Sequence, residues 1–147
     1  MKTHIPDAYL DLVNGPSVAA LTTAMPDGQP QTTVVWCNFD GRHVLVNTMR
    51  GFRKEKNMRL NPKVTLLCYD PRQPLRSLEV RGTVVAMTGA GALEHLDRLC
   101  ELYTGKSPYF GTCVPVAFKE KEMPVICKIL PTRVVTLDAR RKEVVQR

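Results

Sequence analysis

The sequence is poor in aromatic residues, it contains no long apolar run, and no leader peptide is predicted in it. Phe, Trp and Tyr make up 6% of the 147 residues. That is few for a β-barrel that stacks bases on aromatic side chains, so a nucleic-acid partner is not expected. No apolar segment is long enough to span a bilayer. Residues 1–7 carry charge without the apolar stretch of a signal peptide, which predicts a cytoplasmic protein without a membrane partner.

The sequence also lacks the motifs of metal sites and of the common nucleotide-binding folds. No C-x-x-C pair occurs among the five cysteines, and the three histidines share no ligand spacing with them, so no metal site is predicted. Neither G-x-G-x-x-G nor a P-loop is present, which argues against a Rossmann or P-loop fold. Cys113 lies in an irregular loop and is the cysteine expected to be exposed. The others lie in apolar stretches and are expected to be buried, reduced thiols: Cys37, Cys68, Cys100 and Cys127.

The chain does have the composition of one soluble domain, together with an excess of positive charge. Hydrophobic residues make up 44% and charged residues 24% of the chain. Its 147 residues suffice for one core, so a single domain over residues 1–147 is predicted. Lys and Arg number 21 against 14 Asp and Glu, which gives a net charge of +7. Such a balance favours an anionic partner, for example a phosphorylated small molecule.

Short β-branched and apolar runs, separated by turn signals, predict a mainly β fold. The sequences at 26–28 and 40–41 (P-D-G and D-G) predict the turns of two successive hairpins. Because antiparallel strands this numerous must hide their edges, we expect a closed or nearly closed barrel of six or seven strands. Short helices are predicted at 9–13, 53–60 and 93–103. The predicted strands are 18–25, 31–39, 43–48, 63–69, 77–87 (with Gly82 at a bulge or a barrel corner), 125–130 and 133–137 (separated by Pro131).

The segment 47–54 combines the features of a phosphate site. It lies where a predicted strand ends and a short helix begins, and helix N-termini bind anions through free N–H groups and the positive end of the helix dipole. Arg50, Arg53 and Lys54 add positive charge there, while Thr48 allows an oxygen-rich group to approach. Arg can hold a phosphate with two parallel hydrogen bonds, and Lys supplies a mobile point charge. A solvated basic helix face is the alternative interpretation of the same residues.

Short motifs follow one another along almost the whole chain. They are T-x-x-P-D-G-x-P-Q at 23–31, the Asp40-Gly41 turn, an Arg53-Lys54 pair that opens a helix ending in Asn61-Pro62-Lys63-Val64, V-x-G at 80–82 and I-x-P-x-R-V at 129–134. In this order and spacing the chain resembles the flavin-binding split-barrel superfamily, which includes pyridoxamine 5′-phosphate oxidase. The resemblance implies an antiparallel split β-barrel that binds its cofactor between the subunits of a homodimer.

The resemblance also implies which residues contact the cofactor. The strand residues that would line the ring system, largely through backbone groups, are Thr32, Thr33, Val34 and Val35. Asn47 and Thr48 would lie beside the ribityl chain and the phosphate. The phosphate cations would be Arg53 and Lys54, with Arg50 as an additional one. Ser77 falls where the family uses a polar side chain from the partner subunit.

Departures from the family pattern narrow the implied function. Cys37 stands where true pyridoxamine phosphate oxidases have a substrate-binding Lys, and their C-terminal Arg-x-His motif is absent, so that activity is not expected. The shorter relatives that the chain resembles include proteins that use a deazaflavin with a polyanionic tail. The implied cofactor is therefore FMN or coenzyme F420. We predict an oxidoreductase that uses it to transfer hydride to or from a small organic substrate.

The sequence leaves the substrate and the catalytic residues open. Tyr103, Tyr109, His95 and Cys113 are weak candidates for contacting substrate, and none is assigned a catalytic role. The loop 106–123 is expected to shape the substrate side. A carrier or sensor of the same fold that binds flavin or haem without turnover is the main alternative. A nucleic-acid-binding β-barrel is the weaker one.

Overall fold

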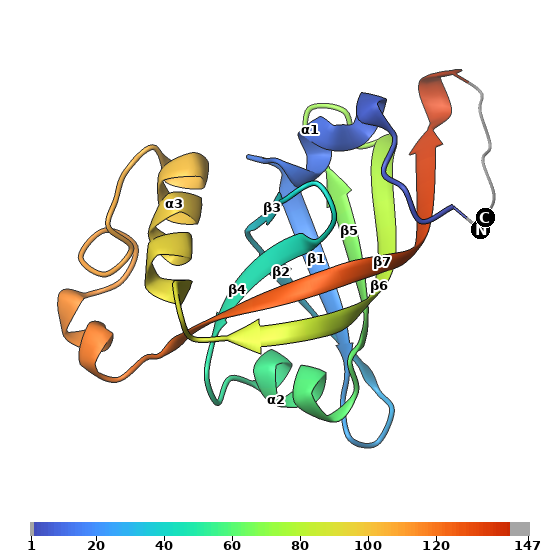
Figure 1. Ribbon diagram of the computed structural model, residues 1–147. Coiled ribbons are helices and arrows are strands. Elements are labelled where there is room, and N and C mark those ends of the chain that lie inside the picture. The colour runs from blue at the N-terminus through green and yellow to red at the C-terminus, as the bar shows by residue number, and fades with distance from the viewer. Residues whose placement is uncertain (1, 142–147) are drawn as a thin grey trace.

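The computed structural model describes residues 2–141 and has the mainly β architecture that the sequence predicts (Figure 1). Within these residues, seven strands form one antiparallel sheet in the order β2-β1-β5-β6-β7-β4-β3. The sheet curls into a half-barrel, which confirms the split β-barrel fold. The strands are β1 (Val18–Ala24), β2 (Pro30–Val35), β3 (Cys37–Phe39), β4 (Val44–Met49), β5 (Lys63–Tyr69), β6 (Arg76–Thr88) and β7 (Pro124–Asp138).

Three α-helices flank the sheet. They are α1 (Leu10–Val13), α2 (Arg53–Leu60) and α3 (Ala92–Thr104), and short 3-10 turns occur at η1 (Asp7–Tyr9), η2 (Val116–Glu120) and η3 (Ala139–Arg141). Helix α2 contacts β1 and β4, whereas α3 contacts β4 and β7. Figure 1 shows α2 below the curled sheet and α3 beside it, with the segment that follows α3 on its outer side. None of the helices in the described part of the chain is both long and apolar enough to cross a membrane.

The core is formed by alternate side chains of the strands, which point to one face of the sheet. In β1, Ala19, Leu21 and Thr23 are buried while the residues between them are half-buried. Leu66 of β5 and Ile129 of β7 are fully buried in the same cluster. The strands thus bury one face each, as the period-two pattern of an antiparallel sheet requires.

The division into strands was predicted wrongly in two regions. The predicted strand 31–39 divides at Trp36 into β2 and β3, which lie at opposite edges of the sheet. The predicted strands 125–130 and 133–137 form one strand, β7, which passes through Pro131. A bulge makes this possible: Gly82 pairs with Pro131 and Arg81 pairs with Arg133, so one residue of β7 is left between them. The extra residue shifts which β7 side chains point inward. The irregularity expected at Gly82 is present as a shift in the β6–β7 register, but the extra residue belongs to β7.

Helix α2 is held against the barrel by a buried amide. Asn57 is 0% exposed, and its Nδ2 donates hydrogen bonds to Thr23 Oγ1 at 3.0 Å and to Met25 Sδ at 3.4 Å. The helix occupies the predicted residues 53–60 and ends before Pro62, because the residue before a proline disfavours helical backbone. The helix is therefore fixed relative to the end of β1.

Candidate functional site

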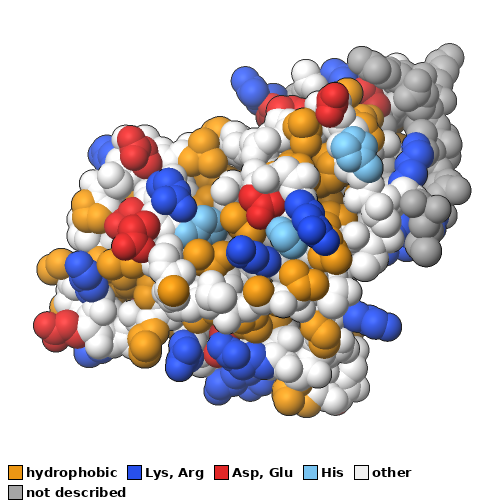
Figure 2. Space-filling model, in the orientation of Figure 1, with side chains coloured by type: hydrophobic (Ala, Val, Ile, Leu, Met, Phe, Trp, Pro, Cys, Tyr) orange, Lys and Arg blue, Asp and Glu red, His pale blue; other side chains and the backbone are white. Residues whose placement is uncertain are grey.

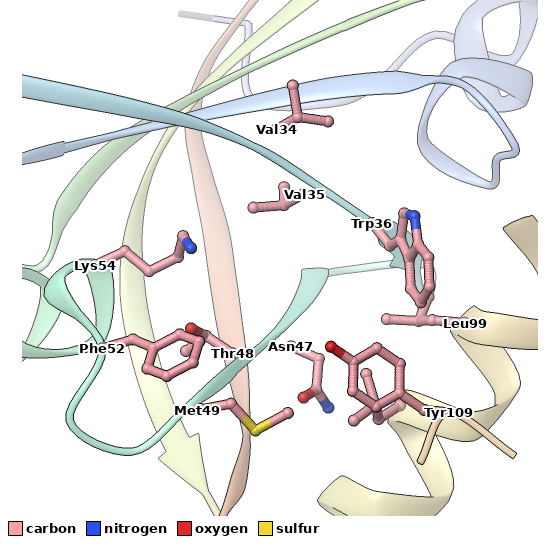
Figure 3. Close-up of a pocket in the computed structure, with 11 residues that line it drawn as sticks. Val34, Val35, Trp36, Asn47, Thr48, Met49, Phe52, Lys54, Leu99 and Tyr109 are labelled. Atoms are coloured by element: carbon pink, nitrogen blue, oxygen red, sulfur yellow. The ribbon is translucent and has the colours of Figure 1, made fainter. Parts of the chain in front are cut away.

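A pocket of about 230 Å³ opens where β2, β4, α2 and α3 meet (Figure 3). Its wall is mostly apolar, and polar groups enter it from β4 and from the start of α2. Such a mixture of an apolar lining with few polar groups is typical of small-molecule sites. The lining residues are Val34, Val35, Trp36, Asn47, Thr48, Met49, Phe52, Lys54, Leu96, Leu99 and Tyr109.

The polar side of the pocket contains buried oxygen atoms that have no partner. Thr48 lies near the end of β4 and is 6% exposed, and its Oγ1 has no hydrogen bond within the described residues. Asn47, the preceding residue, likewise has an unpartnered Oδ1. A buried polar atom without a partner is costly, so both positions favour a ligand that supplies the missing hydrogen bonds.

Lys54 brings a positive charge to the same pocket. The side chain is half-buried, and burial lowers the pKa of its ammonium group. In the described part of the chain Lys54 forms no ion pair. Figure 3 shows the Lys54 side chain extending from α2 toward the part of the pocket that Val35 and Thr48 line. An unneutralised, partly desolvated cation beside a free hydroxyl is suited to an anionic oxygen group.

The turn before α2 is organised by a buried carboxylate. Gly51 has φ +88°, in the left-handed region, and its N–H donates to Glu55 Oε1 at 2.9 Å. Arg59 donates to the other oxygen of Glu55. Burial by itself would raise the pKa of the Glu55 carboxyl, but these hydrogen bonds outweigh it and hold the pKa below its ordinary value. Because Glu55 is already paired, it does not neutralise Lys54.

An aromatic cluster forms the wall opposite α2. The rings of Trp36 and Tyr103 stack at 5.5 Å, and Tyr109 meets Trp36 edge-on at 6.1 Å. The Tyr103 hydroxyl donates to the Cys37 carbonyl and accepts from the Cys37 N–H, both at 3.1 Å. Asp97 on α3 accepts the backbone N–H of Tyr109 at 2.9 Å. Helix α3 therefore positions both the wall and the strand segment next to it.

His95 is a positioning residue that lies behind the pocket. It is 1% exposed, and its Nε2 lies 2.8 Å from Asn38 Oδ1, which can only accept, so the ring proton is assigned to Nε2. Nδ1 then accepts from Asn47 Nδ2 at 3.1 Å, and Asn47 also donates to the Ala92 carbonyl at 3.0 Å. Burial and the nearby charge of Arg98 lower the pKa of His95 to about 4. A neutral His95 thus fixes the side chain of Asn47.

Replacing His95 by Gln is expected to flatten the acid side of the stability profile. Between pH 6.5 and about 4 the unfolded chain binds a proton at His95 that the folded chain does not. The free energy of unfolding of the wild type should therefore fall as the pH decreases through this window, by about 1–2 kcal/mol. Asp40 and Glu55, with lowered pKa values, add their own loss only around and below their ordinary values of 3.8 and 4.5.

Urea unfolding at several pH values across this window measures the effect. The exposed His4→Gln variant is the matched control and should retain the wild-type profile. A His95→Gln variant with the wild-type slope between pH 6.5 and 4.5 would show that another group causes the loss.

The structure brings together half of the residues that the sequence predicts for the site. Val34, Val35, Asn47, Thr48 and Lys54 line the pocket. The other residues do not line it in their own chain: Thr32, Thr33, Arg50, Arg53 and Ser77.

Each of these others has a definite place. Thr32 is exposed, and its Oγ1 lies 2.8 Å from Thr22 Oγ1. Thr33 pairs with the buried Leu21, and its Oγ1 is buried without a partner. Arg50 and Arg53 are exposed. Ser77 lies in β6 opposite Leu137 and Tyr69. Figure 2 shows basic side chains gathered along the lower edge of the molecule, where Figure 1 places α2.

Sequence reasoning did not assign the remaining lining residues to the site. Leu96 and Leu99 were expected only as the apolar stripe of a helix, and Tyr109 only as a weak substrate contact. Met49 and Phe52 lie within the predicted phosphate segment 47–54, which is the signal that could have included them. Nothing in the local sequence indicates that α3 folds back onto β4.

The family model of pyridoxamine 5′-phosphate oxidase matches residues 5–137. The chain therefore belongs to the pyridoxamine 5′-phosphate oxidase family, a family of flavin-related oxidoreductases with this split-barrel fold. A curated relative is the pyridoxine/pyridoxamine 5′-phosphate oxidase of Rubrobacter xylanophilus, which is 42% identical over 55 residues. That match covers 37% of this chain and only 25% of the relative.

Solved structures extend the similarity over most of the chain. A structure named "F420 Reductase" is 30% identical, has a TM-score of 0.76, and is matched over 89% of this chain and 98% of that one. A conserved hypothetical protein from Mycobacterium tuberculosis is 27% identical, with a TM-score of 0.69 over 97% of this chain and 91% of that one. HupZ from Group A Streptococcus is 19% identical with a TM-score of 0.63, covers 90% and 99% of the two chains, and shows the fold alone.

Proposed function

We propose that the chain binds a phosphorylated flavin or deazaflavin in the pocket between β2, β4 and α2, and that it is an oxidoreductase acting on a small organic substrate. The observation that carries this proposal is that the half-buried Lys54 ammonium and the Thr48 hydroxyl, which has no hydrogen-bond partner, line the same pocket. Together they offer a charge and a hydrogen bond to one phosphate group.

The apolar part of the pocket suits a flat ring system. Val34 and Val35 lie at the end of β2, which forms one edge of the sheet, so backbone groups there are free of a second strand partner. Trp36 and Tyr109 close the far side and exclude water from the ring. A bound flavin or deazaflavin supplies the hydride chemistry. The chain's own residues hold the phosphate at Lys54, orient the ring against β2 and keep the pocket dry.

We further propose that a second copy of the chain completes the site. Val34 lines the pocket and is nevertheless 71% exposed. The pairing places Val34, Ala20 and Leu67 in one row across β2, β1 and β5, and Leu67 is 40% exposed. An exposed apolar row that continues from a binding site is typical of a subunit interface. Ser77 does not line the pocket of its own chain, so its contribution to the cofactor site comes from this second copy.

Coenzyme F420 is the cofactor we propose first, with FMN as its direct competitor. The similarity to a protein named F420 reductase, at 30% identity over most of both chains, supports this choice. The net charge of +7 also suits the polyanionic tail of that coenzyme. Of the described residues that line the pocket, only Lys54 and Tyr109 titrate. Because the pocket offers so few groups that could donate or accept a proton, the second candidate function is a carrier that binds the cofactor without catalysing a reaction.

Fluorescence titration of the purified protein with F420 and with FMN tests the proposal, and steady-state reduction of an artificial acceptor separates the enzyme from the carrier.

The Thr48→Val variant should bind the preferred cofactor about tenfold more weakly, since it loses one hydrogen bond to a charged group. The same variant should not lose stability without cofactor, and it should gain up to about 1 kcal/mol, because a buried hydroxyl without a partner is removed. If neither F420 nor FMN binds to the protein, the proposed function is wrong.

A further inference from the structure

Two cysteine sulfurs lie together at the outer side of α3. The Sγ atoms of Cys100 and Cys113 are 3.3 Å apart. Cys100 is on α3 and is 0% exposed, whereas Cys113 lies in the following segment and is exposed. A disulfide bond requires about 2.05 Å between the two sulfurs, so a small movement of the exposed residue closes the gap.

Cys113 belongs to a tight turn that begins at a pocket residue. Its N–H donates to the Tyr109 carbonyl at 2.9 Å, and the Gly111 N–H donates to the Val114 carbonyl at 2.7 Å. The ring of Tyr109 lines the pocket together with Leu99, which lies on α3 one position before Cys100. A covalent bond between the two cysteines would therefore join two parts of the same pocket wall.

The other three cysteines differ from Cys113 because they are buried. Cys37, Cys68 and Cys127 are each 0% exposed and lie in the core of the barrel. Among the cysteines of the described residues, Cys113 is the one that a reagent in solution reaches directly. Cys100 is reached through Cys113, which its sulfur touches.

We propose that Cys113 is a site of reversible thiol modification and that Cys100 resolves the modified residue into an intrachain disulfide, which fastens the Tyr109 turn onto α3. This site is independent of the proposed cofactor chemistry. The oxidant is a small disulfide such as oxidised glutathione.

The chemistry balances in two exchange steps. The Cys113 thiolate attacks one sulfur of the small disulfide, the S–S bond of the oxidant breaks, and one small thiol leaves with the proton that Cys113 released. The Cys100 sulfur then attacks the Cys113 sulfur of the mixed disulfide, and the second small thiol leaves with the proton from Cys100. The two protein thiols are oxidised by two electrons, and the small disulfide is reduced to two thiols.

The rate of the first step should depend steeply on pH. Partial burial of its sulfur and the hydrogen bond with Cys100 raise the pKa of the Cys113 thiol to about 11. Only the thiolate reacts, so at pH values below this pKa the rate should increase about tenfold for each unit by which the pH is raised. The pair is therefore expected to respond slowly at neutral pH and to act as a latch rather than as a rapid peroxide sensor.

Peptide mapping of the folded protein after treatment with oxidised glutathione tests this proposal. Trypsin cuts after Arg98, Lys106 and Lys119, so the disulfide would join peptide 99–106 to peptide 107–119. We expect this joined peptide to be the main product, and a Cys100→Ser variant to keep glutathione bound at Cys113. A Cys113→Ser variant should give neither product. In urea, where proximity is lost, the linkages should spread over the five cysteines.

Three results would overturn the proposal. They are an unmodified Cys113 in the folded protein, a glutathione adduct in the wild type that never proceeds to the joined peptide, and a linkage of Cys113 to a cysteine other than Cys100. If the buried Cys100→Ser substitution prevents folding, the wild-type map and the Cys113→Ser variant, which changes an exposed position, still decide the outcome.

Discussion

Replacing Lys54 by Ala is expected to weaken cofactor binding by tenfold to a hundredfold, roughly what one charge-assisted contact contributes. Lys54 is the half-buried cation of the pocket, and it has no carboxylate partner in the described part of the chain. The loss should appear in the dissociation constant measured by fluorescence titration. Burial lowers the pKa of Lys54, so its ammonium group loses its proton at a lower pH than that of an exposed lysine. As the pH is raised, the wild type should therefore begin to lose affinity for the cofactor at this lower pH.

Two neighbours on the same helix provide the controls for Lys54. Lys56→Ala removes the same charge from an exposed position outside the pocket, and it should change the affinity by no more than about twofold at physiological salt. Arg53→Ala distinguishes two predictions. The family resemblance makes Arg53 a phosphate cation, whose loss should weaken binding. In the structure Arg53 is exposed and does not line the pocket, so its loss should have little effect. Equal losses for Lys54→Ala and Lys56→Ala would mean that a diffuse positive field, and not a contact at Lys54, attracts the cofactor.

Local patterns were sufficient to predict most elements of the fold. Helix α2 begins and ends as predicted, because its polar residues 53–60 are stopped by the Asn61-Pro62 sequence. Helix α3 extends one residue beyond the prediction at each end, since its apolar residues recur at helical spacing and Gly105 ends it with φ +75°. These features depend on neighbours in the sequence, which is why they could be inferred without the structure.

The errors arose where distant parts of the chain decide the local structure. Pro131 was expected to end a strand because it has no N–H to donate. In the structure the strand continues, because a bulge opposite Gly82 absorbs the proline and one extra residue. No pattern within residues 125–137 indicates which residues of β6 pair with them.

The candidate site shows the same limit. Asn47, Thr48 and Lys54 were predicted because the end of a strand and the start of a helix are adjacent in sequence. Four consecutive residues of β2, 32–35, were predicted to line the ring, largely through backbone groups. Only Val34 and Val35 line the pocket, because the pocket opens at the end of β2. The wall from α3 and Tyr109 required long-range packing that the irregular sequence 106–123 does not indicate.

Gly82→Ala is expected to destabilise the protein by about 3 kcal/mol, which is near the upper end for overpacking a core. A Cβ atom at Gly82 would lie 2.6 Å from Ile129 Cγ2 and 2.7 Å from the Leu130 carbonyl oxygen. The second of these contacts is with backbone, so a side-chain rotation cannot relieve it. The β6–β7 pairing would have to separate at the bulge, where Gly82 faces Pro131. Urea unfolding of the variant measures the loss.

Gly89→Ala is the matched control for this prediction, because it adds the same methyl group just beyond the end of β6. Gly89 is exposed, has no positive φ, and would place its Cβ in open space. Its free energy of unfolding should stay within about 0.5 kcal/mol of the wild type. A small effect at both positions would mean that β7 can shift at the bulge without cost. In that case the pairing of Gly82 with Pro131 would not be what holds β7 in register with β6. Because β4 pairs with β7, the position of β4 and of its pocket residues would then depend on other contacts.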